Sequence, residues 1–162
     1  VIVYNIPYRT GRVLGASGIL EIAAHPNVAG IKQSVGALEA DTLEVLAAAP
    51  EGFSVLSGED PYILPIVLLG GLGAIAASAH VCTDRFVALV EAGLKGRLDE
   101  ARAHHEALLP VIRAGFAEPN PAVFKGVLHA QGLIPTPDLR LPMTPASPAA
   151  ISAALAAIDA AS

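Results

Sequence analysis

Residues 28–33 read VAGIKQ, a short apolar run that is followed by a helix pattern. Three other runs have the same character, so we expect strands at about 1–6 (VIVYNI), 28–33 (VAGIKQ), 53–57 (FSVLS) and 73–78 (GAIAAS). Helices are expected in the intervals, at about 17–25, 37–49, 60–70 and 83–95. Runs that are apolar on both faces and alternate with helices are typical of buried parallel strands. The sequence therefore predicts an α/β fold, either an open parallel sheet or half of a closed (β/α)₈ barrel.

From about residue 97 onward, helix patterns replace the strands, and we expect helices at 97–117, 121–131 and 148–161. Three polar residues that suit the N-cap each precede a proline that suits the first turn: Asp60, Asn120 and Ser147. Gly96 and Gly132 stand where helices are expected to end. The chain therefore divides into four βα units in residues 1–96 and a helical region in residues 97–162.

The composition limits the classes of protein to which the chain can belong. Of its 162 residues 53% are hydrophobic, and a formal net charge of -5 gives it no basic face for nucleic acid. The single cysteine, Cys82, excludes an internal disulfide and suits a reducing compartment. The longest apolar run, 63–79, contains Pro65 and three glycines, so it is too interrupted for a membrane span. We expect a soluble cytoplasmic protein with neither a nucleic-acid nor a membrane partner.

Lys32 is the residue best suited to covalent chemistry. Of the three lysines, Lys95 and Lys125 fall in helix patterns, whereas Lys32 lies in an apolar strand with no carboxylate within three residues. Lysine is seldom buried without a role, and desolvation lowers the pKa of an amine until its neutral, nucleophilic form is accessible. Two interpretations stay open, a nucleophilic lysine and a strand-edge lysine whose ammonium reaches water.

Tyr4 closes the first predicted strand, and Arg9 lies in the loop that is predicted to follow it. In a βα barrel the active site forms at the C-terminal strand ends, so Tyr4, Arg9 and Lys32 would share one face. The Tyr4 phenol could move protons, and the Arg9 guanidinium could bind a carboxylate through two parallel hydrogen bonds. A core tyrosine and a solvated loop arginine are the alternative interpretations.

Other motifs carry less weight. The segment GLGAIA at 71–76 resembles a dinucleotide-binding fingerprint but precedes a strand, whereas that fingerprint opens a helix. Its glycines suit close backbone approach or tight packing. The five histidines lack metal-ligand spacing, so no metal site is expected, and His104 and His105 are assigned to a solvated helix face. Glu59 and Asp60 are interpreted as a helix cap.

Five blocks occur in the order and spacing of one family: YNIPYRTG at 4–11, GIKQS at 30–34, LSGED at 56–60, EPNP at 118–121 and LRLPMTP at 139–145. On these blocks the sequence resembles the dihydrodipicolinate synthase / N-acetylneuraminate lyase family, and the last two blocks resemble the synthases in particular. The resemblance implies a (β/α)₈ TIM-type barrel, with residues 1–96 as its second half and residues 97–162 as a C-terminal helical extension. It also implies a cytoplasmic homotetramer.

The resemblance implies roles for five residues. Lys32 matches the lysine that forms an imine with pyruvate, so no separate cofactor is expected. Tyr4 matches the tyrosine that shuttles protons, and Arg9 matches the arginine that binds the carboxylate of aspartate semialdehyde. Gly58 and Ile75 match residues that line the pyruvate pocket. The implied enzyme is a Schiff-base lyase that condenses pyruvate with L-aspartate 4-semialdehyde to 4-hydroxy-tetrahydrodipicolinate, in diaminopimelate and lysine biosynthesis.

Two features depart from the family pattern. Tyr8 stands where the synthases usually carry a small residue, which narrows the mouth of the site. The chain also begins on VIVY without an initiator methionine, and the family's first four βα units do not appear, so we expect a partial chain that is inactive alone.

Three functions stay open. They are the synthase, another pyruvate aldolase such as N-acetylneuraminate lyase or a sugar-acid aldolase, and a non-catalytic half-barrel that self-associates. Arg9 favours the synthase, because neuraminate lyases generally lack it.

Overall fold

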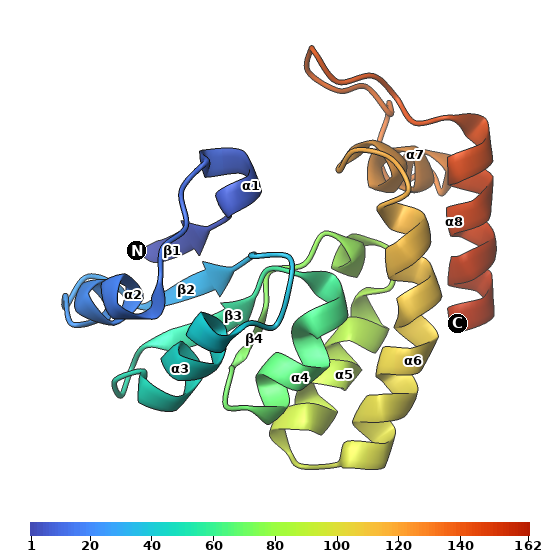
Figure 1. The fold of residues 1–162 in the computed structure, drawn as a ribbon. Coiled ribbons are helices and arrows are strands. Elements are labelled where there is room, and N and C mark those ends of the chain that lie inside the picture. The colour runs from blue at the N-terminus through green and yellow to red at the C-terminus, as the bar shows by residue number, and fades with distance from the viewer. The chain divides into compact units, whose positions relative to one another are not determined.

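The computed structural model describes residues 1–162 and divides them into two compact packing units (Figure 1). The sheet unit consists of Val1–Ala76 and Val90–Leu98. The helical unit consists of Ala77–Leu89 and Asp99–Ser162. The division follows a different line from the expected regions 1–96 and 97–162, because Ala77–Leu89 packs with the later helices.

A four-stranded parallel sheet forms the sheet unit, in the order β1 (Ile2–Asn5), β2 (Gly30–Gln33), β3 (Ser54–Ser57) and β4 (Gly73–Ala74). All four predicted strands are confirmed, although β4 is shorter than the expected 73–78. The Ile75 amide still donates to the Ser57 carbonyl (2.9 Å), after which the chain leaves the sheet. Because the strands are parallel, their C-terminal ends meet at one edge.

Helices occupy most of the intervals in which the periodicity predicts them. The sheet unit contains α1 (Pro7–Thr10), α2 (Ala16–Ala23), α3 (Ala40–Ala48), the 3-10 helix η1 (Asp60–Tyr62), α4 (Ile63–Leu68) and the last turn of α5 (Thr83–Leu94). The sequence predicts a loop after β1, and this prediction is wrong. Pro7 begins the single turn of α1, and Gly11 ends it in the left-handed conformation at φ 67°.

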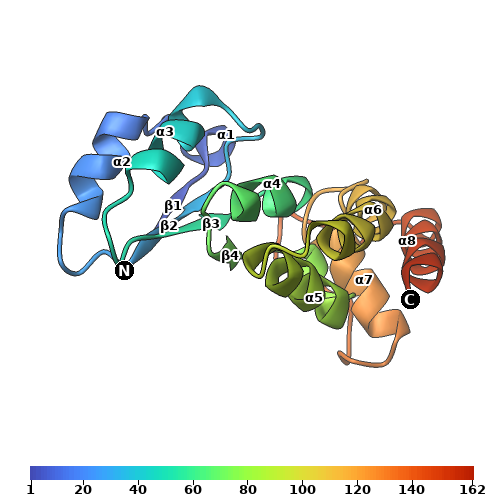
Figure 2. The ribbon, with the colours of Figure 1, turned by 90° about the horizontal axis from the view of Figure 1, so that it is seen from below.

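One face of the sheet is covered by α2 and α3, which lie side by side (Figures 1 and 2). Buried apolar side chains fill this interface: Ala16, Ile19, Ala23, Ile31, Val45, Phe53 and Val55. On the opposite face, Ile2 and Tyr4 of β1 are 48% and 47% exposed. Within residues 1–162, the side chains of β1 therefore alternate between a covered face and an open face.

The helical unit contains the first part of α5, the 3-10 helix η2 (Ser78–His80), α6 (Leu98–Gly115), α7 (Ala122–Ala130) and α8 (Pro148–Ala161). Mostly small residues form its core: Val111, Ala122, Val123, Val127, Ala146, Ala154, Ile158 and Ala161. A Cβ at Gly126 on α7 would lie 2.5 and 2.7 Å from Cδ1 and Cγ1 of Ile151 on α8. Glycine is therefore what permits these two helices to approach so closely. No helix of the chain combines the length and apolar character needed to span a bilayer.

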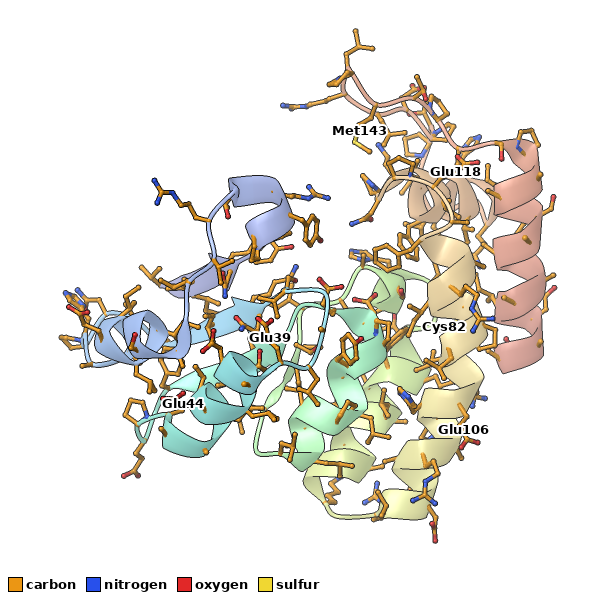
Figure 3. All side chains as sticks on the ribbon, viewed as in Figure 1. Glu39, Glu44, Cys82, Glu106, Glu118 and Met143 are labelled. Atoms are coloured by element: carbon orange, nitrogen blue, oxygen red, sulfur yellow. The ribbon has the colours of Figure 1, made fainter.

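The helix caps agree with the sequence at three of the positions singled out. The Ser147 Oγ accepts from the Ala150 amide (3.2 Å) at the start of α8 and donates to Glu118 Oε1 (2.5 Å; Figure 3). Gly96 and Gly132 take left-handed φ values of 69° and 74° just beyond α5 and α7. At α7 the predicted cap is wrong, because Pro121 itself holds the N-cap position.

The prediction of a solvated face for His104 and His105 on α6 is wrong as well. Both side chains are half-buried, and the Nδ1 atom of each is buried with no hydrogen-bond partner. Ala101 and Leu108, both fully buried, lie three and four residues away, so the histidines border the same helix face. Burial lowers the pKa of His105, although Glu106 opposes the effect.

Candidate active site

Lys32 and Tyr4 meet on the open face of the sheet. The register of β1 against β2 sets Tyr4 beside Lys32, one residue before both strands end. The Lys32 Nζ lies 4.1 Å from the centroid of the Tyr4 ring, so the cation sits over the ring face. Such contacts stabilise by about 0.5–1 kcal/mol at exposed sites. The structure thus brings together the two residues to which the sequence assigns catalysis.

Gly58 makes room for the stem of this lysine. A Cβ at Gly58 would lie 2.8 and 2.9 Å from Lys32 Cγ and Cε and would collide with Ser34 Oγ. Any larger residue would therefore displace the lysine or the serine. Ser34 is fully buried, and its Oγ has no hydrogen-bond partner. Ser34 is not among the predicted site residues, although its spacing of two residues from Lys32 places it on the same side of an extended strand.

A buried polar network fixes the register between the two strands from the covered face. Asn5 Nδ2 donates to Gln33 Oε1 (3.0 Å) and to the Leu14 carbonyl (3.2 Å). Gln33 Nε2 in turn donates to Thr42 Oγ1 on α3 (3.0 Å). Asn5 and Gln33 directly follow Tyr4 and Lys32, so the network holds the two candidate residues side by side. Sequence reasoning missed it, because the pairing partner of Asn5 depends on the register.

Arg9 and its neighbour Tyr8 project from α1, which follows β1. The side chains of Tyr8 and Arg9 are joined by a hydrogen bond, and both are largely exposed. Partial burial raises the pKa of the Tyr8 phenol, as do the negative charge of Glu59 and the nearby Tyr4, while Arg9 opposes them. Tyr8 therefore interacts both with Arg9 and with Glu59 and Tyr4.

Glu59 is a further ionisable group beside Lys32. Its prediction as a helix cap is wrong for the side chain, which makes no capping hydrogen bond to η1. The Gly36 amide, just beyond β2, donates to the carboxylate, whereas Glu59 Oε1 is buried with no partner. Burial, followed by the charge of Asp60, raises the pKa of Glu59, and the Gly36 amide and Lys32 partly offset the rise.

Ile75 lies next along the same edge of the sheet. Its amide donates to the carbonyl of Ser57, the residue before Gly58, and its side chain is 44% exposed. The C-terminal strand ends thus carry an amine, a phenol, a carboxylate and a guanidinium on neighbouring segments. A positioned amine next to groups that exchange protons is suited to nucleophilic catalysis.

The sequence model of the dihydrodipicolinate synthetase family matches residues 1–161. The chain belongs to this family. A 4-hydroxy-tetrahydrodipicolinate synthase of Salinibacter ruber is 41% identical over 146 residues, which are 90% of this chain and 48% of the relative. The synthase of Listeria welshimeri is 37% identical over 143 residues, 88% of this chain and 48% of the relative. The chain spans about half the length of the curated relatives it matches.

Solved members of the family have the same fold. A dihydrodipicolinate synthase of Thermotoga maritima matches with a TM-score of 0.93 and 30% identity, over 99% of this chain and 55% of that one. The synthase of Acinetobacter baumannii, solved in complex with pyruvate, matches with a TM-score of 0.90 and 28% identity, over 99% and 54%. These neighbours are TIM-type barrels, so the predicted α/β barrel class is confirmed, with four βα units in this chain.

Proposed function

We propose that the chain carries the imine-forming centre of a 4-hydroxy-tetrahydrodipicolinate synthase. This lyase would condense pyruvate with L-aspartate 4-semialdehyde in the diaminopimelate route to lysine. The observation that carries the proposal is the position of Lys32 Nζ, 4.1 Å above the Tyr4 ring at the C-terminal edge of parallel strands. The names of the relatives and the pyruvate complex of one solved neighbour support it.

The chemistry follows from an amine that forms a covalent bond with the substrate, so no separate cofactor takes part. Neutral Lys32 attacks the ketone carbon of pyruvate, and loss of water gives a protonated imine. This cation withdraws electrons from the methyl carbon, which loses a proton to give an enamine. The enamine carbon bonds to the aldehyde carbon, and the acceptor's amino group then attacks the imine carbon, closes the ring and releases Lys32. The Tyr4 phenol supplies and accepts protons in these steps.

The remaining residues would bind and orient the two substrates. Arg9 would bind the carboxylate of the semialdehyde through its guanidinium, whose planar geometry suits two parallel hydrogen bonds. Gly58 and Ile75 would line the pyruvate pocket. In support of this, Gly58 touches the Lys32 stem and the Ile75 amide bonds to the residue before Gly58.

Reductive trapping tests the role of Lys32. Pyruvate and borohydride are added to the complete gene product that carries residues 1–162, and the modified peptide is found by mass spectrometry. We expect the reduced pyruvate adduct on Lys32, its loss in Lys32→Ala, and normal labelling in Lys95→Ala, whose exposed lysine is ion-paired with Glu91. An adduct on Lys95 or Lys125 in place of Lys32 would contradict the proposal.

Arg9 separates the synthase from other pyruvate aldolases. Because hydrogen bonds to charged groups are strong, Arg9→Ala should raise the KM for aspartate semialdehyde roughly tenfold to a hundredfold. Pyruvate trapping should stay within about twofold of the wild type, because Arg9 is assigned to the second substrate. An unchanged KM would contradict the carboxylate role of Arg9, and a wild type that does not use aspartate semialdehyde would favour a sugar-acid aldolase or a neuraminate lyase.

We also propose, from the resemblance to the family, that the protein is a cytoplasmic homotetramer acting on small molecules. One solved relative is described as a monomeric variant, so the assembly of this protein needs its own measurement, by size-exclusion chromatography with light scattering. A well-folded oligomer that fails to trap pyruvate would favour the non-catalytic half-barrel.

A further inference from the structure

Glu59 carries a buried acceptor that no group of residues 1–162 uses. One side of its carboxylate is held by the Gly36 amide, while Oε1 is buried without a partner. A buried carboxylate oxygen without a hydrogen bond is unfavourable, and such atoms are uncommon in folded proteins. The proton transfers assigned to Tyr4 and Lys32 make no use of Glu59. The Glu59 side chain as a whole is only half-buried, so a bound substrate can supply the missing donor once the carboxylate turns toward it.

Glu59 interacts electrostatically with both the reactive amine and the residues beside the proposed carboxylate site. Glu59 directly follows Gly58, whose Cα faces the Lys32 stem, and the Lys32 charge lowers the pKa of Glu59. On the other side, Glu59 raises the pKa of Tyr8, which is hydrogen-bonded to Arg9. The carboxylate is thus near both Lys32 on β2 and the Tyr8–Arg9 pair on α1.

The functional groups of the proposed second substrate follow one another in an order that matches Arg9, Glu59 and Lys32. Aspartate semialdehyde carries its carboxylate and its amino group on the same carbon, and its aldehyde lies at the other end of a short chain. With the carboxylate on Arg9 and the aldehyde beside the carbon bound to Lys32, the amino group falls between them. We infer that Glu59 Oε1 accepts a hydrogen bond from the amino group of the acceptor aldehyde and so selects an amino-acid aldehyde over one without the amine. This inference rests on the proposed function.

The same contact assists ring closure. The amino group arrives as an ammonium and must lose a proton before its lone pair can attack the imine carbon. Glu59 Oε1 takes that proton, so an N–H bond breaks and an O–H bond forms. The nitrogen then bonds to the imine carbon, and the Glu59 proton passes to the Lys32 nitrogen. The bond from that carbon to Lys32 breaks as the ring nitrogen forms a C=N double bond and releases its remaining protons to solvent, so Lys32 leaves as a neutral amine. A carboxyl group whose pKa is raised by burial is a better base for this step than a solvated one.

The test compares two aldehydes that differ only in the amine. Aspartate semialdehyde and succinic semialdehyde share the carboxylate and the aldehyde, and the complete gene product is assayed as wild type, Glu59→Gln and Glu59→Asp. We expect Glu59→Gln to raise the KM for aspartate semialdehyde roughly tenfold to a hundredfold. The inhibition constant of succinic semialdehyde and the borohydride trapping of pyruvate should change less than about twofold. Glu59→Asp should restore part of the loss, because it keeps the charge.

Glu44→Gln is the matched control, since this exposed carboxylate lies on α3 in the same packing unit (Figure 3). It should leave all three readings unchanged. An equal loss for both aldehydes in Glu59→Gln, or a loss of pyruvate trapping, overturns the inference, as does an unchanged KM. A wild type that traps no pyruvate overturns the proposed function and this inference with it, whereas normal trapping with an equal loss overturns this inference alone.

Discussion

Glycine has opposite roles in the two packing units. In the helical unit, Gly126 lets α7 approach α8 so closely that a Cβ at this position would overlap the apolar side chain of Ile151. In the sheet unit, Gly58 leaves a space that Lys32 and the unpaired hydroxyl of Ser34 occupy. Gly126 therefore permits a close apolar contact between two helices, whereas Gly58 leaves space for a reactive amine. The same absence of a side chain therefore contributes to stability in one unit and to chemistry in the other.

The largest effect that follows from this comparison concerns Gly58→Ala. A Cβ at this position would displace the Lys32 stem, and a shift of about 1 Å at a reacting group can cost roughly a hundredfold in rate. We expect the rate of pyruvate trapping to fall by about that factor, measured by mass spectrometry. Loss of trapping accompanied by global unfolding, seen by circular dichroism, would contradict a local role for Gly58.

Gly126→Ala should have the reverse profile. The added Cβ would overlap Ile151, and overpacking of this kind destabilises by about 1–3 kcal/mol. Chemical denaturation should show this loss, while pyruvate trapping below the unfolding transition stays at the wild-type rate. An equal defect in trapping would break the distinction between the two glycines.

A smaller effect is expected at the cap of α8. Ser147→Ala removes the hydrogen bond to the Ala150 amide and the one to Glu118. Loss of such a cap costs about 1 kcal/mol, which should appear as a lower denaturation midpoint with no change in trapping. Ser147→Asp would keep an acceptor for the amide but would repel Glu118, so it should recover less stability than a neutral Ser147→Asn.

The smallest effect concerns pH and His105. Burial lowers the pKa of His105 below 6.5, so the unfolded chain binds this proton more readily than the folded one. The contribution is fully present above pH 6.5 and is lost as the pH falls through the lower folded pKa. Denaturation between neutral and acidic pH should therefore show a shallower loss of stability in His105→Gln than in the wild type.

His25→Gln is the control for this measurement, because the His25 side chain is exposed. His25→Gln should lose as much stability between neutral and acidic pH as the wild type does. The same slope in His105→Gln and in the wild type would show that the burial of His105 does not contribute to acid sensitivity.

The elements that could be predicted are those in which one periodic pattern controls the backbone. The four strands, the long helices and the Ser147 cap follow from apolar runs and from single residues with strong local preferences. The meeting of Tyr4 with Lys32 was also accessible, since parallel strand ends share an edge. The one-turn helix α1 was not, because four residues are too few to show a periodic pattern of apolar positions.

The parts that escaped prediction depend on contacts between distant segments. Glu59 follows a strand and precedes Pro61, which is a typical cap position, and only the fold shows that its carboxylate meets the Gly36 amide instead. Similarly, the need for a glycine at position 58 follows only from the path of the Lys32 side chain, which comes from another strand. His105 has a charged neighbour in sequence, so its partial burial could not be read from the helix pattern alone.

The contact between Lys32 and Tyr4 gives the protein an internal optical probe. Residues 1–162 contain three tyrosines and no tryptophan, so tyrosine dominates the near-ultraviolet absorption of this segment. A positive charge held over the face of the Tyr4 ring perturbs the electronic transition of that ring. Conversion of the Lys32 amine to an imine relocates that charge, and the tyrosine spectrum changes with it. The covalent step could therefore be followed in real time, by stopped-flow difference absorption, without any added label.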